Sequence, residues 1–286
     1  MSLVKILLLA MVQGAAELLP VSSSAHVIVM EKLLGLDPTT PEMTLLLVML
    51  HTGTMFAVIC YFWNFWKINF FSSWPGFWIF AKLVVVATAC TGVVGLTLKY
   101  AIEKFGFRHV PHAEIEMMFG NLLLIAAALA AVGLLIIYAG LRPNRRRQGS
   151  DLGIKESAWI GAVQGVCLPF RGFSRSGATI STGLVLGVAK DKLEAFSFAL
   201  AVVLTPPVIL REVLRFLQAP AVSGSQGAGS IALFYPSLLG MVLSFGSGIL
   251  ALKWLSRWLE QGRWQLFGFY CLFFAAVVFL LYLIGY

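Results

Sequence analysis

Charged side chains are scarce in this chain of 286 residues, because Asp, Glu, Lys and Arg together make up only 12% of it. Hydrophobic residues reach 59%, and the mean hydropathy of +0.88 lies far above that of soluble domains. So apolar a chain leaves no stretch for a separate soluble catalytic module. We therefore expect a single polytopic membrane domain that comprises residues 1–286.

Cysteine is sparse too, and the four cysteines are dispersed through apolar runs without the spacing of metal ligands. We interpret them as small hydrophobic residues that face lipid or the core. Acidic residues are outnumbered, with 13 Asp and Glu against 21 Lys and Arg. A basic excess is also found in nucleic-acid-binding proteins. In an apolar chain, loop cations at a membrane surface explain it better, so we expect no nucleic-acid partner.

Six stretches are apolar enough, and near enough to the required length of about twenty residues, to be expected to cross a bilayer as helices. Three of them carry no charge: Met117–Leu141, Ser230–Leu252 and Gln265–Tyr286. The other three are less pure: Met43–Trp66, Phe77–Lys99 and Leu193–Leu210. The sequence thus predicts an all-α integral membrane protein with six transmembrane helices.

The polar segment Gln164–Thr179 separates two apolar runs, Ser157–Phe170 and Ser176–Ala189, that are too short to span. A segment broken by Gly and Pro is tolerated at membrane depth only where protein or a water-filled cavity surrounds it. Arginines, serines and a threonine make this one cationic and rich in hydroxyls. We predict a re-entrant helix–loop–helix hairpin whose tip binds an anion.

The N-terminal region has the same pattern, with Leu3–Ala16 and Ala25–Leu34 on either side of a polar break. Pro20 is expected to end the first half-helix at Leu19, and one of the three serines at 22–24 to cap the second. The run that begins at Lys5 mimics a secretory signal, but the polar residues after it look functional. We expect this segment to remain in the mature protein.

The two polar breaks are related in sequence. Val12-Gln13-Gly14 matches Val163-Gln164-Gly165, Leu19-Pro20 matches Leu168-Pro169, and serines follow in both. Each hairpin also precedes three predicted spans. We therefore expect an inverted-topology repeat of two halves, about 1–141 and 153–286, with the hairpin tips meeting near the membrane midplane. Chance recurrence of short motifs is the alternative.

Loop charges give the orientation of this arrangement. The side with twelve cations holds Lys67, Lys82, Arg142, Arg145, Arg146, Arg147, Lys155, Lys190, Lys192, Lys253, Arg257 and Arg263. The other side has seven: Lys5, Lys32, Lys99, Lys104, Arg108, Arg211 and Arg215. The richer side is expected to be cytoplasmic, which places both termini and the first hairpin at the outer face.

Polar side chains in the first hairpin form a candidate site. Gln13 and Glu17 are four residues apart and share a helix face. Ser23 and His26 are three apart, so we expect their side chains to meet. Ionisable groups in a membrane-embedded segment are costly, which makes this set a functional hypothesis. His51, within a predicted span, either lines the same cavity or is a hydrogen-bonded structural residue.

The second hairpin supplies the anion-binding groups. Arg175 lies between Ser174 and Ser176 at a predicted helix N-terminus, where backbone N–H groups, hydroxyls and a guanidinium suit a phosphate. A purely structural reading, with serines as caps and an Arg–Glu pair, is the alternative. Elsewhere in the chain, His109 and His112, beside Glu114, form a weaker candidate for a metal site.

Two motifs resemble those of a known family. Gln13-x-x-x-Glu17 followed by Leu19-Pro20-Val21-Ser22-Ser23-Ser24-Ala25-His26 resembles the first signature of the bacterial undecaprenyl-diphosphate phosphatases, the bacitracin-resistance proteins. Gly172-Phe173-Ser174-Arg175-Ser176-Gly177-Ala178-Thr179 resembles the second. Two departures stand out. Gln13 occupies the first acidic position of the family pattern, and Arg171-Gly172 replaces its Pro-Gly.

The resemblance implies an enzyme that hydrolyses undecaprenyl diphosphate to undecaprenyl phosphate and recycles the lipid carrier for the cell wall. It implies a multi-pass protein of the bacterial inner membrane, whose active site we expect to open to the periplasmic face. Its partners are then the polyprenyl diphosphate and the membrane. Whether it forms a homodimer is left open.

The resemblance also implies roles for the site residues. Ser23 is the expected nucleophile with His26 as its general base, and the reverse assignment, with His26 attacking, stays open. Glu17 is expected to support Mg²⁺ or Ca²⁺. Arg175 is expected to stabilise the transition state. The expected phosphate-binding residues are Gln13, Ser22, Ser174, Ser176 and Thr179.

A lipid-phosphate transporter or flippase is the alternative from another class, because paired re-entrant hairpins are a transporter architecture. A flippase needs no nucleophile and base, so Ser23 and His26 favour the enzyme. A phosphatase for other diphosphate lipids shares every residue, and the sequence does not reveal the preferred chain length.

Overall fold

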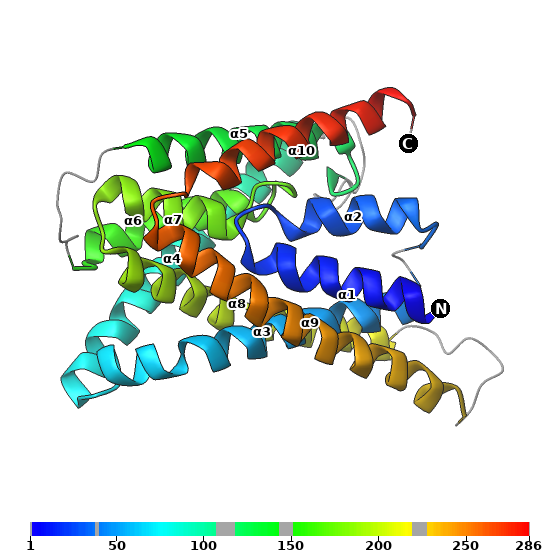
Figure 1. Ribbon diagram of the computed structural model, residues 1–286, viewed down its shortest axis with the longest axis horizontal. Helices are drawn as coiled ribbons and strands as arrows, with labels where there is room; N and C mark the ends of the chain where they lie inside the picture. Colours follow the sequence, from blue (N-terminus) through cyan, green and yellow to red (C-terminus); the bar gives the residue numbers. More distant parts are fainter. Residues whose placement is uncertain (1, 38–39, 107–117, 143–150, 219–227, 286) are drawn as a thin grey trace.

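The computed structural model describes residues 2–37, 40–106, 118–142, 151–218 and 228–285. Ten α-helices and one short π-helical turn, η1 (Ile102–Gly106), make up this part of the chain, and none of it is β-strand. In chain order, two short helices precede three long ones, and the pattern then repeats (Figure 1). The cluster of His109, His112 and Glu114 lies outside the described residues.

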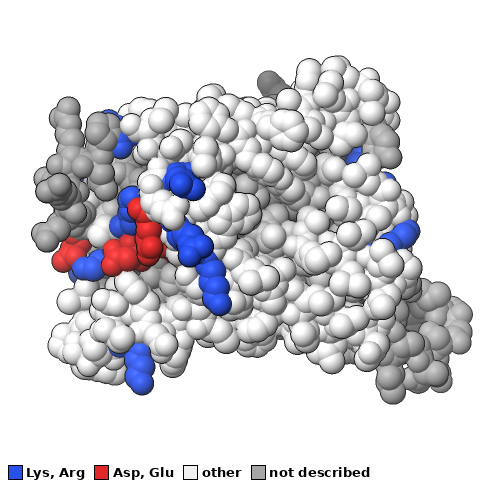
Figure 2. Space-filling view, viewed as in Figure 1, with Lys and Arg blue, Asp and Glu red and all other residues white. Residues whose placement is uncertain are grey.

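The six predicted transmembrane helices are confirmed as helices that are long and apolar enough to span. They are α3 (Pro41–Asn69), α4 (Trp74–Ala101), α5 (Leu122–Leu141), α8 (Lys190–Gln218), α9 (Ala228–Glu260) and α10 (Gln265–Leu283). Figure 2 shows a face whose broad middle is uncharged, with charged side chains toward its ends. Large apolar side chains such as Val85, Val93 and Leu96 of α4 are exposed along the spans, as lipid contact requires.

Local sequence signals set where the long helices begin. The side chains of Thr40 and Ser73 accept hydrogen bonds from backbone N–H groups in the first turns of α3 and α4. A proline follows each cap, where its missing N–H costs no helical hydrogen bond. Asn121 caps α5 in the same way.

The first pair of short helices, α1 (Leu3–Leu18) and α2 (Ser23–Leu33), forms a hairpin. Leu19 is extended just before Pro20, so the proline ends α1 as predicted. At the open end of the hairpin, Lys5 Nζ donates to the carbonyl of Leu34 across 2.7 Å. The start of α1 and the end of α2 therefore lie together.

The second pair, α6 (Ile154–Cys167) and α7 (Arg175–Leu186), is built alike. Ser174 caps α7 by accepting from the N–H of Gly177 at 3.2 Å. Asp151, just before α6, forms an ion pair with Lys192, just after α7, so this hairpin is also closed at its open end. The two hairpins enter from opposite ends of the molecule, and their tips meet inside it (Figure 1).

Each hairpin packs against the opposite half of the chain: α1 lies on α9, and α6 lies on α4, while α5 and α10 run side by side (Figure 1). Glycines allow both close contacts. A Cβ at Gly14 would overlap Ser244 and Ser247 of α9, and a Cβ at Gly165 would lie 2.8 Å from the carbonyl oxygen of Thr91 in α4. The matching glycines of the two hairpins, Gly14 and Gly165, thus make equivalent helix contacts.

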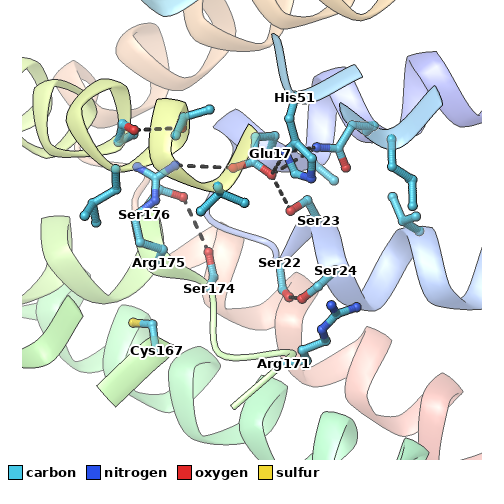
Figure 3. A pocket seen from close by; sticks show the side chains of 18 of the residues that line it. Glu17, Ser22, Ser23, Ser24, His51, Cys167, Arg171, Ser174, Arg175 and Ser176 are labelled. Carbon is cyan, nitrogen blue, oxygen red and sulfur yellow. Dashed lines mark hydrogen bonds and ion pairs between the residues drawn. The ribbon is translucent and has the colours of Figure 1, made fainter. Parts of the chain in front are cut away.

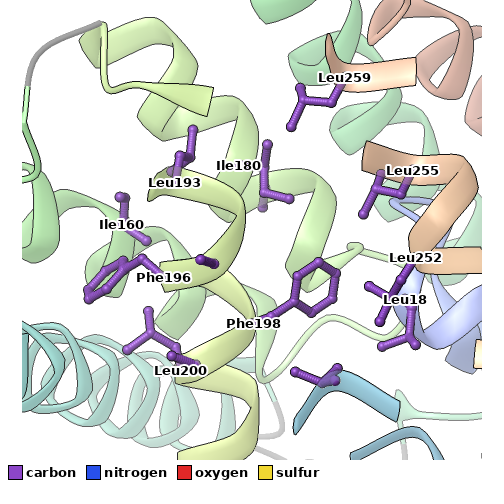
Figure 4. Close-up of a cluster of buried hydrophobic side chains, with 14 of the residues drawn as sticks. Leu18, Ile160, Ile180, Leu193, Phe196, Phe198, Leu200, Leu252, Leu255 and Leu259 are labelled. Atoms are coloured by element: carbon purple, nitrogen blue, oxygen red, sulfur yellow. The ribbon is translucent and has the colours of Figure 1, made fainter. Parts of the chain in front are cut away.

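The main hydrophobic core joins the hairpins to the spans. Leu18 of α1, Ile180 of α7 and Phe198 of α8 are buried in one cluster with Leu252 and Leu255 of α9 (Figure 4). This packing holds the C-terminal end of α1 next to the N-terminal end of α7. These two helix ends carry the polar residues of the hairpin tips.

Candidate active site

A cavity of about 820 Å³ lies where the two hairpin tips meet. Its polar end is formed by residues of both tips, with Glu17 and Ser23 from the first hairpin and Arg175 from the second (Figure 3). Apolar side chains of α2, α3 and α8 line its remaining walls. The N-termini of α2 and α7 both face this space, so two sets of backbone N–H groups favour an anion here.

Ser23 and Glu17 form the shortest polar contact in the cavity. The hydroxyl of Ser23, the first residue of α2, donates to Glu17 Oε2 across 2.6 Å. Glu17 lies in the last turn of α1, so the tight turn between the two helices brings the hydroxyl and the carboxylate together. This contact supplies Ser23 with an acceptor for its proton.

Three further side chains surround the Glu17 carboxylate. Arg175 Nη2 lies 3.4 Å from Oε1, Gln13 Nε2 donates to Oε2 at 3.1 Å, and His51 Nδ1 lies 3.7 Å from Oε2. Burial raises the pKa of Glu17, but His51 and Arg175, with hydrogen bonds from Ser23 and Gln13, outweigh this effect and hold it below its usual value. Glu17 is therefore a carboxylate at neutral pH. His51, which the sequence left undecided, lines the cavity.

The predicted meeting of Ser23 with His26 is not found. The ring of His26 turns back, so that Nδ1 donates to the carbonyl of Ser22 at 2.8 Å, and Nε2 is 2.7 Å from the hydroxyl of Tyr270. Phe274 stacks on the ring at 3.9 Å between centroids. Burial lowers the pKa of His26, and a neutral ring that donates from Nδ1 accepts from Tyr270 at Nε2. His26 does not line the cavity.

Ser22 occupies the cap position of α2 but does not cap it with its side chain. Its φ of +68° is the one positive value among the described residues other than glycine, and such a conformation is strained. Ser22 Oγ instead lies 3.2 Å from Ser24 Oγ, and Ser24 accepts from the N–H of Gly172 at 3.3 Å. The strained turn thus presents the serine cluster to the cavity and ties it to the second hairpin.

The hydroxyls of the second hairpin are less equivalent than the sequence suggested. Ser174 and Ser176 line the cavity, and Ser176 also donates to the carbonyl of Leu19 at 3.2 Å, which links the two tips. Thr179 does not reach the cavity. It is buried, donates to the carbonyl of Arg175 at 2.8 Å and lies 2.6 Å from Ser197 Oγ. It therefore supports the backbone of Arg175 and has no direct access to a ligand.

The donor set bears on the expected divalent cation. Among the described residues, no group of three His, Cys, Asp or Glu side chains could hold a metal ion. Glu17, the amide oxygen of Gln13 and the serine hydroxyls are nonetheless oxygen donors of the kind that hard cations prefer. Magnesium is commonly held by one or two carboxylates together with substrate phosphates. These residues fit such an ion only when phosphate oxygens complete its coordination.

Comparison with known proteins identifies the family. The model of the family described as "Bacitracin resistance protein BacA" matches residues 6–277. This chain belongs to that family. It is 58% identical over 279 residues to "Undecaprenyl-diphosphatase 2" of Acinetobacter baylyi, with 97% of each chain covered. It is 30% identical to "Undecaprenyl-diphosphatase" of Rhodopirellula baltica, with 94% of each covered.

Both departures from the BacA signatures lie on the cavity. Gln13 is buried, with 1% of its surface exposed, and its amide bridges Glu17 and His51, so the carboxylate expected at this position is replaced by a donor to Glu17. Arg171 also lines the cavity, as does Glu31 of α2, which the sequence reading did not select. One signal could have identified Glu31: it follows Ser24 and Val27 or Ile28 at intervals of three or four residues, so it shares their face of α2.

Proposed function

We propose that this protein hydrolyses undecaprenyl diphosphate to undecaprenyl phosphate and inorganic phosphate, and so recycles the lipid carrier for cell-wall synthesis. The observation that carries the proposal is the cavity at the hairpin tips, where a hydroxyl bonded to a carboxylate faces an arginine and two helix N-termini. The names of relatives that match nearly the whole chain support the substrate. The apolar walls of the cavity suit a prenyl chain.

In the proposed reaction, Ser23 Oγ attacks the terminal phosphorus, and Glu17 takes the serine proton. The bond between that phosphorus and the bridging oxygen breaks, and undecaprenyl phosphate leaves. Water then attacks the phosphoserine, returns one hydrogen to Ser23 and leaves the other on inorganic phosphate, while Glu17 releases its proton to solvent. Glu17 replaces His26 as the proposed base, because its oxygen lies 2.6 Å from Ser23 Oγ and both ring nitrogens of His26 are bonded elsewhere.

Arg175 is proposed to bind the terminal phosphoryl group and to stabilise the charge that develops on it. Its Nη1 is buried, and no described residue accepts a hydrogen bond from it. Such an uncompensated donor is costly unless a ligand uses it. Ser22, Ser174 and Ser176 are proposed to bind phosphate oxygens alongside it.

A divalent cation, Mg²⁺ or Ca²⁺, remains part of the proposal. Glu17 and Gln13 would hold it together with phosphate oxygens, and its charge would offset that of the diphosphate. Removal of divalent ions with a chelator should abolish phosphate release, and Glu17→Gln should weaken the dependence on added Mg²⁺. Full activity in the chelated protein would refute the requirement.

We also propose that the two hairpins are re-entrant and that the halves are related by inverted topology in the bacterial inner membrane. Three observations support this arrangement. Polar contacts hold together the two ends of each hairpin that lie away from its tip, and the hairpins enter from opposite ends of the molecule. The packing of α1 on α9 also matches that of α6 on α4. By the loop charges, the first hairpin opens to the periplasm.

Cysteine labelling tests this topology in a background without the four native cysteines. Single cysteines at Lys5 and Gly35 should react with an impermeant reagent from the periplasm, and one at Lys190 only from the cytoplasm. Reaction of positions 5 and 35 from opposite faces would show that the first hairpin spans the membrane and would refute the repeat.

The proposed activity is tested by phosphate release from undecaprenyl diphosphate by the detergent-solubilised protein. We expect release by the wild-type protein and none above background by Ser23→Ala. Lipid transport without hydrolysis in reconstituted vesicles would instead support the flippase, whose paired-hairpin architecture this fold shares. A series of polyprenyl diphosphates would establish the preferred chain length.

A further inference from the structure

Arg171 and Glu31 are charged residues of the cavity that the proposed chemistry does not use. Arg171 lies in the tip of the second hairpin, and Glu31 lies on α2 in the first. Both face the same space as the serine cluster (Figure 3 shows Arg171 beside Ser22 and Ser24). Two side chains of opposite charge therefore lie beside the proposed catalytic residues without a role in the reaction.

Three contacts fix the position of Arg171 and of Gly172 beside it. The next residue, Gly172, has a φ of +101°, and its N–H donates to Ser24 Oγ, one residue after the proposed nucleophile. A Cβ at Gly172 would also lie 2.6 Å from the carbonyl oxygen of Ile125, so the loop is held against α5. The guanidinium lies 4.4 Å above the ring of Phe119, which presents its flat face and orients the fork.

Glu31 lies farther along the cavity wall. It is seven residues after Ser24, which corresponds to about 10 Å along the axis of α2. Only 5% of its surface is exposed, and no described residue donates to its buried Oε1. Burial raises the pKa of Glu31 to about 7, and the positive charge of Arg171 acts against this effect. A carboxylate with an unpartnered oxygen therefore faces the cavity within the electrostatic reach of Arg171.

A diphosphate needs two sets of cationic partners. The proposed roles of Ser23 and Arg175 account for the terminal phosphoryl group only, and the lipid-linked phosphoryl group lies directly beyond the bridging oxygen. Arginine suits this second group because its planar fork can donate two parallel hydrogen bonds to phosphate. Arg171 and Arg175 are four residues apart on one hairpin tip, and the serine cluster lies between them in Figure 3.

We propose that Arg171 binds the lipid-linked phosphoryl group of the substrate and that Glu31 competes with this phosphate for Arg171. The inference rests on the proposed phosphatase function and assigns a specificity residue to it. The diphosphate can then contact Arg175 and Arg171 at once, one with each phosphoryl group. Each product carries a single phosphoryl group and so cannot use both contacts. The negative charge of Glu31 attracts the guanidinium and repels phosphate, which favours release of the products.

This inference predicts opposite effects of two neutralising substitutions on the KM for undecaprenyl diphosphate. Arg171→Gln should raise KM by about tenfold to a hundredfold, the range for a hydrogen bond to a charged group. Glu31→Gln should lower KM by about fivefold because the competing charge is lost. The kcat of Glu31→Gln should stay within about threefold of wild type, because Glu31 does not contact the bond that breaks. Arg171→Lys should restore part of the affinity.

A merely structural ion pair predicts a different result, since loss of either partner would then harm the protein in the same way. Equal directions of change in KM, or no change in either variant, would refute the inference. Lys32→Gln is the matched control. Lys32 is exposed on α2, the helix that carries Glu31, and it has the same positive charge as Arg171. Its KM should equal that of wild type.

The products give a second readout that separates recognition from folding. Inhibition by undecaprenyl phosphate, which keeps the lipid-linked phosphoryl group, should weaken in Arg171→Gln about as much as the KM for the diphosphate rises, whereas inhibition by inorganic phosphate should change little. If Arg171→Gln proves unstable, Arg171→Lys and Glu31→Gln still give opposite signs under the inference. Absence of phosphate release by the wild-type protein would refute the proposed function itself, whereas normal release with an unchanged KM in Arg171→Gln would refute only the inference.

Discussion

The hydroxyl of Ser23 donates to the carboxylate of Glu17 across 2.6 Å, and this contact joins α1 to α2 at the proposed catalytic centre. A nucleophile and its base act as a unit, so their losses should not add. Ser23→Ala and Glu17→Gln should each reduce the phosphate release rate by about 10³-fold or more, and the double variant should be little worse than either. Single-turnover kinetics with undecaprenyl diphosphate would measure this cycle. Multiplicative losses would mean that Glu17 does not serve Ser23.

His26 should behave differently from Ser23, because its two ring nitrogens are bonded to the Ser22 carbonyl and the Tyr270 hydroxyl and not to the nucleophile. Tyr270→Phe removes one hydrogen bond and should lower the rate by about fivefold. The effects of Tyr270→Phe and His26→Ala should be non-additive, whereas those of His26→Ala and Ser23→Ala should not show this coupling. Coupling of His26 with Ser23 as strong as that of Glu17 would restore His26 as the base.

The architecture and the site could be predicted from the sequence to different extents. The six spans and four half-length helices followed from the lengths of the apolar runs, and Pro20 ended α1 as its geometry requires. The relation of Ser23 to His26 did not follow. A spacing of three residues places two side chains near one face of a helix, but the left-handed Ser22 at its start sends Ser23 toward Glu17, while His26 turns back to the Ser22 carbonyl.

Contacts between segments far apart in the chain were also beyond the sequence reading. Glu31 acquires its place in the cavity only when the second hairpin brings Arg171 to the end of α2. Thr179 has the residue type of a phosphate ligand, but its position one helical turn after Arg175 directs it to a backbone carbonyl and Ser197. Tertiary packing decides both cases.

Close packing of the hairpins on the spans predicts a clear effect of added methyl groups. Gly165→Ala would place a Cβ 2.8 Å from the Thr91 carbonyl oxygen, so α6 and α4 must move apart, and overpacking of this kind costs about 1–3 kcal/mol. Gly246→Ala is the matched control, because nothing lies within 4 Å of a Cβ there. The midpoint of thermal unfolding in detergent should fall for the first variant and not for the second. Equal midpoints would contradict the packing of α6 on α4.

The buried carboxyl of Glu31 makes stability depend on pH. Burial raises its pKa from 4.5 to about 7, so the folded protein binds this proton more tightly than the unfolded chain does. Between these two values the folded state holds more protons, and the contribution of Glu31 to stability falls as the pH rises from about 4.5 through about 7. Glu31→Gln removes this titration, so the fall in unfolding midpoint from pH 5.5 to pH 8 should be smaller in the variant than in wild type.

The same pH series separates Glu31 from the other titrating groups of the protein. Lys32→Gln changes the adjacent residue of α2 without removing a buried carboxyl, so its fall in midpoint should match that of wild type. Arg171→Gln removes the positive charge that holds the pKa of Glu31 down, and this variant should lose stability over a range that extends to higher pH. An identical pH dependence in wild type and Glu31→Gln would mean that Glu31 keeps its ordinary pKa in the folded protein, and that the carboxyl is not shielded from water.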